Sequence, residues 1–173
     1  MKTEEKILLI RLSSLGDAVL ATAALEALRA QRPQLRVDIL TKSAFGEVFA
    51  THPSVGKVIF WENGDSPLKM ASILRKEGYW RVFDLHRNLR TKLLRLFLRG
   101  PKWSVYHKGA VRRRIALFFR AKSLLWNADH VTRRYVEALS PLGVGASSFL
   151  PRLYPSEGDA ARAREALLAG GWD

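Results

Sequence analysis

Short apolar runs alternate with helix-like stretches along most of this chain, and no other feature constrains its fold as strongly. We expect strands at Ile7–Leu12, Val37–Thr41, Lys57–Trp61, Trp80–Leu85 and Trp103–Tyr106. We expect helices over residues 18–31, 44–51, 67–77, 89–98 and 160–169, and further helices starting near Val111 and Asp129. Apolar strands that alternate with helices are typical of a parallel sheet buried on both faces. The sequence therefore predicts an α/β domain with a parallel sheet and helices on both faces.

Several helix ends carry recognisable capping and stop signals. Ser66 followed by Pro67 suits the start of a helix, because serine caps the amide groups of the first turn and proline fits its first position. The last helix begins with Ser156 and Asp159, which are spaced as in a capping box. It follows a segment that holds Pro151 and Pro155. We therefore divide the chain into a domain over residues 1–155 and a helix over residues 156–173 that leads towards another domain.

Composition narrows the class of protein. The chain has 173 residues and no cysteine, so one ordinary domain is expected, without disulfides or thiolate metal sites. The amino terminus is charged and enters a strand directly, with no signal-peptide core. No apolar run approaches the roughly 20 residues that a transmembrane helix needs. We expect a cytoplasmic protein.

The turn after the first strand holds the most suggestive side chains. It reads Ser13-Ser14-Leu-Gly16-Asp17 and lies between a strand and a helix, where an open α/β sheet binds its ligands. Gly16 would let a ligand approach the backbone closely. Asp17 suits proton abstraction from a sugar hydroxyl, although aspartate is also a favoured helix cap, and the two roles are compatible. Ser13 and Ser14 fit either plain turn residues or substrate contacts.

Positive charge is concentrated in one part of the sequence. The formal net charge is +13, and twelve Lys or Arg residues but no acid lie between Asp84 and Asp129. Such a region indicates an anionic partner. In the helix over 89–98, the cations Lys92, Arg95 and Arg99 share one face. We expect the other face, which carries Leu89, Leu93, Leu96 and Phe97, to pack on the sheet. The bases Arg112, Arg113 and Arg114 precede an apolar stretch that fits either an interfacial membrane segment or a core helix with a basic edge.

Other common sites find little support in the sequence. The first loop matches neither phosphate-binding glycine motif, G-x-G-x-x-G or G-x-x-x-x-G-K-[ST], which disfavours a nucleotide there. His86 follows a strand but has no companions at metal-ligand spacing, so we expect no metal and no cofactor. It lies at the sheet edge that also carries Asp17.

The motif Ile10-Arg-Leu-Ser-Ser-Leu-Gly-Asp17 resembles the N-terminal signature of the ADP-heptose:lipopolysaccharide heptosyltransferases, glycosyltransferase family 9. The resemblance continues in order through residues 37–40, 52–59, 80–94 and 130–143. It implies a Rossmann-like parallel sheet that forms the N-terminal half of a GT-B glycosyltransferase. This half would bind the acceptor, and a C-terminal domain beyond Asp173 would bind the donor, ADP-heptose.

The resemblance also implies a function and a set of site residues. Heptose would pass from ADP-heptose to the Kdo/heptose inner core of lipopolysaccharide with inversion, with Asp17 as the general base. The partners would be a Kdo-lipid A type acceptor and an anionic membrane surface, with the enzyme peripheral at the inner face of the inner membrane. Nucleic acid would not be a partner. The expected acceptor-binding residues are Arg11, Ser13, Ser14, Gly16, His86, Arg87, Arg90, Lys92, Arg112, Arg113 and Arg114.

Two other readings stay open at this point, and one departure from the family bears on the acceptor. The charge would also suit a basic nucleic-acid-binding α/β domain, although no motif that reads RNA or DNA is evident. A free-standing nucleotide-binding domain of flavodoxin type is disfavoured by the acid in the first loop. His86 and Arg87 stand where the family usually has a glutamine and a glycine, which leaves the exact acceptor open.

Overall fold

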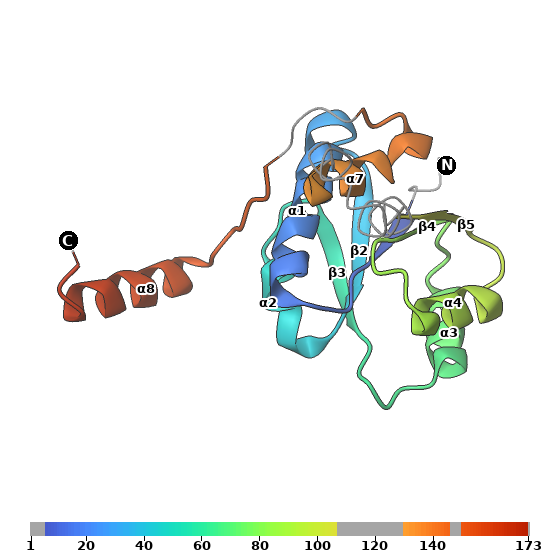
Figure 1. The fold of residues 1–173 in the computed structure, drawn as a ribbon, viewed down its shortest axis with the longest axis horizontal. Helices are drawn as coiled ribbons and strands as arrows, with labels where there is room; N and C mark the ends of the chain where they lie inside the picture. The colour runs from blue at the N-terminus through green and yellow to red at the C-terminus, as the bar shows by residue number, and fades with distance from the viewer. Residues whose placement is uncertain (1–5, 107–129, 146–149, 173) are drawn as a thin grey trace, which may run out of the picture.

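The computed structural model describes residues 6–106, 130–145 and 150–172. Five strands form one parallel sheet in the order β3-β2-β1-β4-β5 (Figure 1). Their bounds are β1 Lys6–Ile10, β2 Arg36–Thr41, β3 Val55–Phe60, β4 Arg81–Asp84 and β5 Lys102–Val105. The chain builds outward from β1 to β3 and then returns to the other side of β1. The strand order therefore reverses between β1 and β4.

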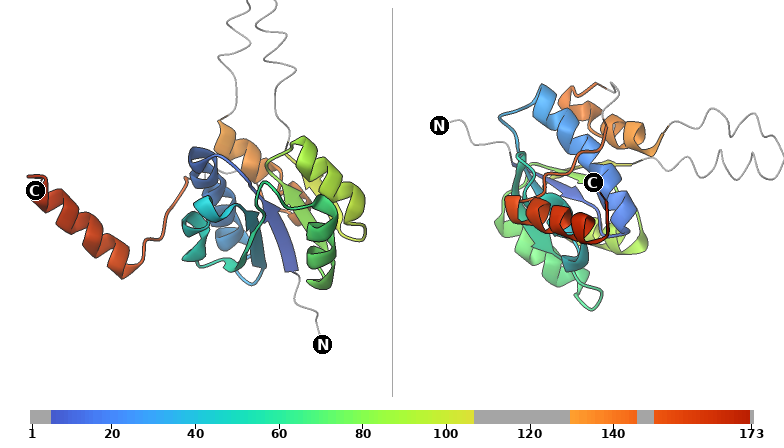
Figure 2. Two further views of the ribbon diagram at one scale, coloured as in Figure 1. Left: turned by 90° about the horizontal axis from the view of Figure 1, so that it is seen from below. Right: turned by 90° about the vertical axis from the view of Figure 1, so that its left-hand side faces the viewer.

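Helices cover both faces of the sheet, as Figure 2 shows. One face carries α1 (Leu15–Gln31), α2 (Glu47–Ala50) and α7 (Val131–Glu137), and the other carries α3 (Pro67–Lys76) and α4 (Leu89–Phe97). In β1, Ile7 and Leu9 enter the first core while Leu8 and Ile10 enter the second, because successive side chains of a strand point to opposite faces. The predicted Rossmann-like α/β class is confirmed.

The structure changes some of the expected boundaries. Helix α1 begins at Leu15 rather than Ala18, and its N-cap is Ser14 rather than Asp17. Residues 44–51 do not form one helix but a 3-10 turn, Ser43–Phe45, followed by α2. A second 3-10 turn, Ser140–Leu142, follows α7. The helix expected from Val111 lies outside the described residues.

Helix α4 packs on the sheet as expected, but of its predicted apolar face Phe97 contacts the core and the three leucines do not. Its buried residues are Thr91 and Leu94, whereas Leu89, Leu93 and Leu96 are 73%, 38% and 58% exposed. The capping residue Asn88 accepts a hydrogen bond from the Thr91 amide at 2.8 Å, and Thr91 faces inward next to this cap. The leucine ridge is consequently turned towards solvent.

The C-terminal part consists of residues 150–155, called the strap, which dock on α1, and of a separate helix. In the strap, the Arg152 amide donates to Thr22 Oγ1 at 3.0 Å, and the Tyr154 hydroxyl donates to Glu26 at 2.8 Å. Helix α8 (Glu157–Ala169) begins with the predicted capping box of Ser156 and Asp159. It has no buried residue and lies away from the sheet and its helices (Figures 1 and 2).

Candidate functional site

The loops that follow β1 and β4 lie side by side at the reversal point of the sheet. Ile10 and Asp84 are register partners at the ends of the two strands, and the Leu85 amide donates to the Ile10 carbonyl at 3.1 Å. In open α/β sheets ligands bind outside the carboxyl ends of the strands at such a point. The structure thus brings residues 11–17 and 85–88, far apart in sequence, to one edge.

Arg11 joins these two loops from the inside. Its side chain is nearly buried, with the residue 6% exposed, and its Nη1 donates to the Leu85 carbonyl at 2.6 Å. The guanidinium also forms an ion pair with Asp17 and lies over the Tyr135 ring, 5.5 Å from its centroid. Because Arg11 is bound by the protein's own groups, it acts as a positioning residue for Asp17.

Asp17 lies at the mouth of this edge, in the first turn of α1. Its Oδ2 accepts hydrogen bonds from the Ser14 amide and the Ser14 hydroxyl, both at 3.3 Å. Its Oδ1 lies 3.5 Å from the Tyr135 hydroxyl of α7. The side chain is still 37% exposed. The carboxylate is therefore held by three neighbours and open to a ligand.

The surroundings of Asp17 keep it ionised. Partial burial would raise its pKa, but the positive charge of Arg11 and the hydrogen bonds from Ser14 outweigh this and hold the pKa below the ordinary value for aspartate. Burial raises the pKa of Tyr135, against the opposing effect of Arg11, so its phenol stays protonated. At neutral pH the site presents a carboxylate next to a neutral hydroxyl donor.

A buried aspartate shapes the loop on the β4 side. Asp84 Oδ1 accepts the amide hydrogens of His86 at 2.9 Å and Arg87 at 2.8 Å. This turn places Arg87 in the left-handed region, with φ at +49°, a conformation that glycine adopts more readily than other residues. Arg87 is exposed, and His86 is partly buried. The backbone conformation at position 87 is therefore one that favours glycine.

The remaining predicted acceptor residues differ in their placement. Arg90 stacks on Trp61, 4.0 Å from the ring centroid, and donates to carbonyl groups of the loop after β3, including Glu62, so its guanidinium serves that loop. Lys92 is exposed on α4. Gly16 is exposed, and a Cβ built there would meet no atom within 4 Å. Arg112, Arg113 and Arg114 lie outside the described residues.

Three residues at the site were not predicted as site residues from the sequence. Asp84 and Asn88 shape and cap the β4 loop, and a strand-end aspartate followed by an N-cap residue was a usable signal. Tyr135 comes from α7, 118 residues after Asp17, and no local pattern could have found it. Among the described residues, no group of His, Cys, Asp or Glu could hold a metal ion, and no helix is long and apolar enough to cross a membrane.

Comparison with known proteins identifies the fold. No family model matches the chain, and no curated protein matches it. Among solved structures, the glycosyl transferase family 9 from Veillonella parvula DSM 2008 has a TM-score of 0.74 at 20% identity, covering 100% of this chain and 52% of that one. E. coli ADP-heptose lps heptosyltransferase II has a TM-score of 0.66 at 21% identity, covering 94% and 50%.

A third solved structure agrees with these two. E. coli heptosyltransferase WaaC with ADP has a TM-score of 0.63 at 18% identity, covering 84% of this chain and 50% of that one. The chain thus spans about half the length of each of these glycosyltransferases. Its Rossmann-like α/β fold is the fold that it shares with glycosyltransferase family 9 structures.

Proposed function

We propose that this chain is the acceptor-binding half of a GT-B heptosyltransferase, which transfers heptose from ADP-heptose to the Kdo/heptose inner core of lipopolysaccharide. The observation that carries the proposal is the Asp17 carboxylate, ionised and partly exposed at the reversal point of the sheet. The shared fold with two heptosyltransferase structures supports it. The donor would bind to the other half of the complete enzyme.

In this proposal Asp17 is the general base. Its carboxylate accepts the proton of an acceptor hydroxyl while the hydroxyl oxygen attacks the anomeric carbon of heptose. The bond from that carbon to the ADP oxygen breaks, ADP leaves with the bonding electrons, and in-line displacement inverts the configuration. The low pKa of Asp17 makes it a modest base, so proton transfer would follow as the new bond forms and the hydroxyl becomes acidic.

The neighbours of Asp17 would fix its direction. Arg11 and the Ser14 amide hold Oδ2, whereas Oδ1 accepts only the long 3.5 Å hydrogen bond from the Tyr135 hydroxyl and would take the proton of the acceptor hydroxyl. Tyr135 lies close enough to Oδ1 to help orient the bound hydroxyl. A general base must lie within hydrogen-bond reach of the proton it removes, and a carboxylate held by its second oxygen meets that need.

The rim of the site would recognise the anionic acceptor. Arg87 is exposed beside the β4 loop, and a guanidinium is well suited to the carboxylates of Kdo and to phosphates. Ser13, Ser14, Gly16 and His86 line the same edge. An enzyme that acts on such an acceptor would work as a peripheral protein at the cytoplasmic face of the inner membrane.

Replacing Asp17 with asparagine in the protein that carries both halves tests the proposal. Losing a general base should lower kcat by a factor of roughly 10²–10⁴. Asparagine can still accept from Ser14, but the nearly buried Arg11 loses its counter-ion, so the melting temperature should fall as well because a buried charge is left uncompensated. Kinetics on a soluble Kdo-containing acceptor, with melting curves beside them, measure both effects.

The control is Asp65→Asn, because Asp65 also holds a backbone amide, that of Glu62, in the loop after β3 at 2.8 Å. It should keep near-normal turnover. If Asp17→Asn transfers heptose at the rate of the control, Asp17 is not the base.

A further inference from the structure

The outer face of α4 presents a row of leucines to solvent. Leu89, Leu93 and Leu96 follow one another at spacings of four and three residues, which places them on one side of a helix. They lie opposite the buried residues Thr91 and Leu94. A surface helix normally turns its apolar stripe to the core. Helix α4 follows this rule with Leu94 and Phe97, which pack against the core, but it also carries the three exposed leucines as a second apolar stripe. The packing of α4 on the sheet does not account for this second stripe.

Cations run beside the leucines. Lys92 and Arg95 are exposed on α4, and Arg99 is exposed just beyond its end, at spacings of three and four residues. These six side chains, Leu89, Lys92, Leu93, Arg95, Leu96 and Arg99, are called the α4 face below. Neither α3 nor α4 contains an acid. Nothing on these two helices neutralises the positive charge.

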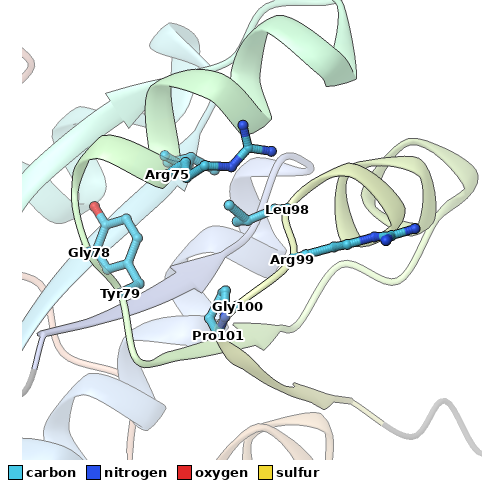
Figure 3. A pocket seen from close by; sticks show the side chains of 8 residues that line it. Arg75, Gly78, Tyr79, Leu98, Arg99, Gly100 and Pro101 are labelled. Atoms are coloured by element: carbon cyan, nitrogen blue, oxygen red, sulfur yellow. The ribbon is translucent and has the colours of Figure 1, made fainter.

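Helix α3 packs beside α4 and extends the same pattern. Its exposed side chains include Leu68, Lys69, Ile73 and Lys76. At the far end of the pair, a cavity of about 250 Å³ opens between the last turns of the two helices. Figure 3 shows Arg75 and Arg99 beside this cavity, with Leu98 between them. The mixture of apolar and cationic groups thus continues across both helices.

This combination points to one kind of partner. A second copy of the chain would bring the same positive charge to the interface and be repelled. A lipid bilayer with anionic headgroups takes leucines at the boundary of its acyl chains and attracts the bases to its phosphates. We infer that the α4 face docks on an anionic phospholipid bilayer.

The inference deepens the proposed function and rests on it for its setting. Helix α4 starts directly after the β4 loop that carries His86 and Arg87. A bilayer in contact with the α4 face would therefore lie next to the candidate site. An acceptor anchored in that bilayer by lipid A would approach the candidate site from the side of the β4 loop.

Sedimentation with lipid vesicles tests the inference on the 173-residue chain. We expect binding to vesicles of phosphatidylcholine with phosphatidylglycerol, and none to phosphatidylcholine alone. Each base near an anionic surface contributes about a five-fold gain in partitioning, so replacing Lys92, Arg95 and Arg99 with glutamine should weaken binding roughly 100-fold. Replacing Leu89, Leu93 and Leu96 with glutamine should weaken it at least about ten-fold.

A matched control comes from α8, which is equally exposed. Leu167 and Leu168 are 54% and 60% exposed, and Arg164 lies nearby on the same helix. Replacing these three with glutamine should leave vesicle binding unchanged. Melting curves confirm that each variant is folded. Binding that survives both α4 variants, or that the α8 variant weakens equally, overturns the inference.

Three further outcomes bear on this inference, and the last two separate it from the proposed function. Self-association without lipid that the leucine variant abolishes would assign the α4 face to a second copy and overturn the bilayer. If the two-domain protein needs the α4 face to bind vesicles but transfers no heptose, the inference is upheld and the proposed function is refuted. If the protein transfers heptose to a soluble acceptor but the α4 variants bind vesicles normally, the proposed function is upheld and the inference is refuted.

Discussion

At the scale of single residues, one side chain can have opposite effects on stability and on binding. Arg87 has its backbone in the left-handed region, which costs most residues about 1–2 kcal/mol. Its guanidinium nevertheless stands at the rim of a site proposed to bind an anion. Strain of this kind is often retained at functional positions. Arg11 also combines a cost in stability with a place at the site, because burying a charge is unfavourable and this nearly buried cation pairs with Asp17.

The substitution Arg87→Gly tests this reading. Glycine adopts the left-handed conformation readily but loses more entropy on folding, so the free energy of unfolding should rise by up to about 1 kcal/mol. In the complete enzyme the KM for a Kdo-containing acceptor should increase. Chemical denaturation and acceptor kinetics measure the two effects.

Arg95→Gly serves as the comparison, because Arg95 is exposed inside α4 where glycine destabilises a helix by about 1 kcal/mol. The two substitutions should therefore shift stability in opposite directions. A loss of stability at position 87 as large as that at position 95 would contradict the backbone explanation.

At the scale of elements, local capping decides where helices start and hence what they present. Ser14 rather than Asp17 caps α1, and this leaves Asp17 at the third helical position with one oxygen open to the site. Asn88 caps α4 and thereby makes Leu89, which is exposed, its first residue. In both helices the cap places a functional side chain as well as stabilising the first turn.

The cap of α3 offers a direct measurement. Ser66 Oγ accepts from the Leu68 amide at 3.2 Å, so Ser66→Ala should lower the free energy of unfolding by about 1 kcal/mol. Ser72→Ala, at an exposed position inside the same helix, should be neutral or slightly stabilising because alanine has the higher helix propensity. Equal losses in the two variants would show that the cap contributes nothing.

At the scale of the whole molecule, the C-terminal strap packs against the buried side chain of His52. His52 Nε2 lies 3.2 Å from Glu26, and its ring packs edge-on against Tyr154 at 4.9 Å between centroids. Burial favours the neutral imidazole and lowers the pKa of His52, with Glu26 acting against this and Arg29 adding to it. The strap that leads to α8 is therefore sensitive to protonation at this point.

This sets an expected pH dependence of stability. The unfolded chain takes up a proton at His52 near pH 6.5, whereas the folded chain takes it up at a lower pH. The unfolded state thus binds more protons between these two values, and stability falls as pH drops below about 6.5. Denaturation at a series of pH values should show the fall. In the variant His52→Asn, which keeps an acceptor for the Ser54 amide, the free energy of unfolding should change less with pH over this window. An unchanged pH dependence would exclude His52 as its source.

The sequence by itself determined the class of fold, the succession of strands and helices along the chain and the place of Asp17 after the first strand. Alternating apolar strands and helices admit few arrangements other than a parallel sheet covered on both faces, and a loop after the first strand must then lie at the ligand edge. These are consequences of short-range pattern. The caps at Ser66 and Ser156 could be predicted for the same reason.

Only the tertiary structure decided what surrounds Asp17 and which way α4 faces. Tyr135 and Leu85 meet Arg11 and Asp17 through sheet and helix packing over 74 to 118 residues of sequence, and no local pattern records such contacts. The leucines of α4 could equally have packed inward by periodicity. Their exposure follows from the way α4 packs on the sheet, because burying Thr91 and Leu94 turns the opposite side of the helix to solvent. Which side is buried depends on residues outside the helix.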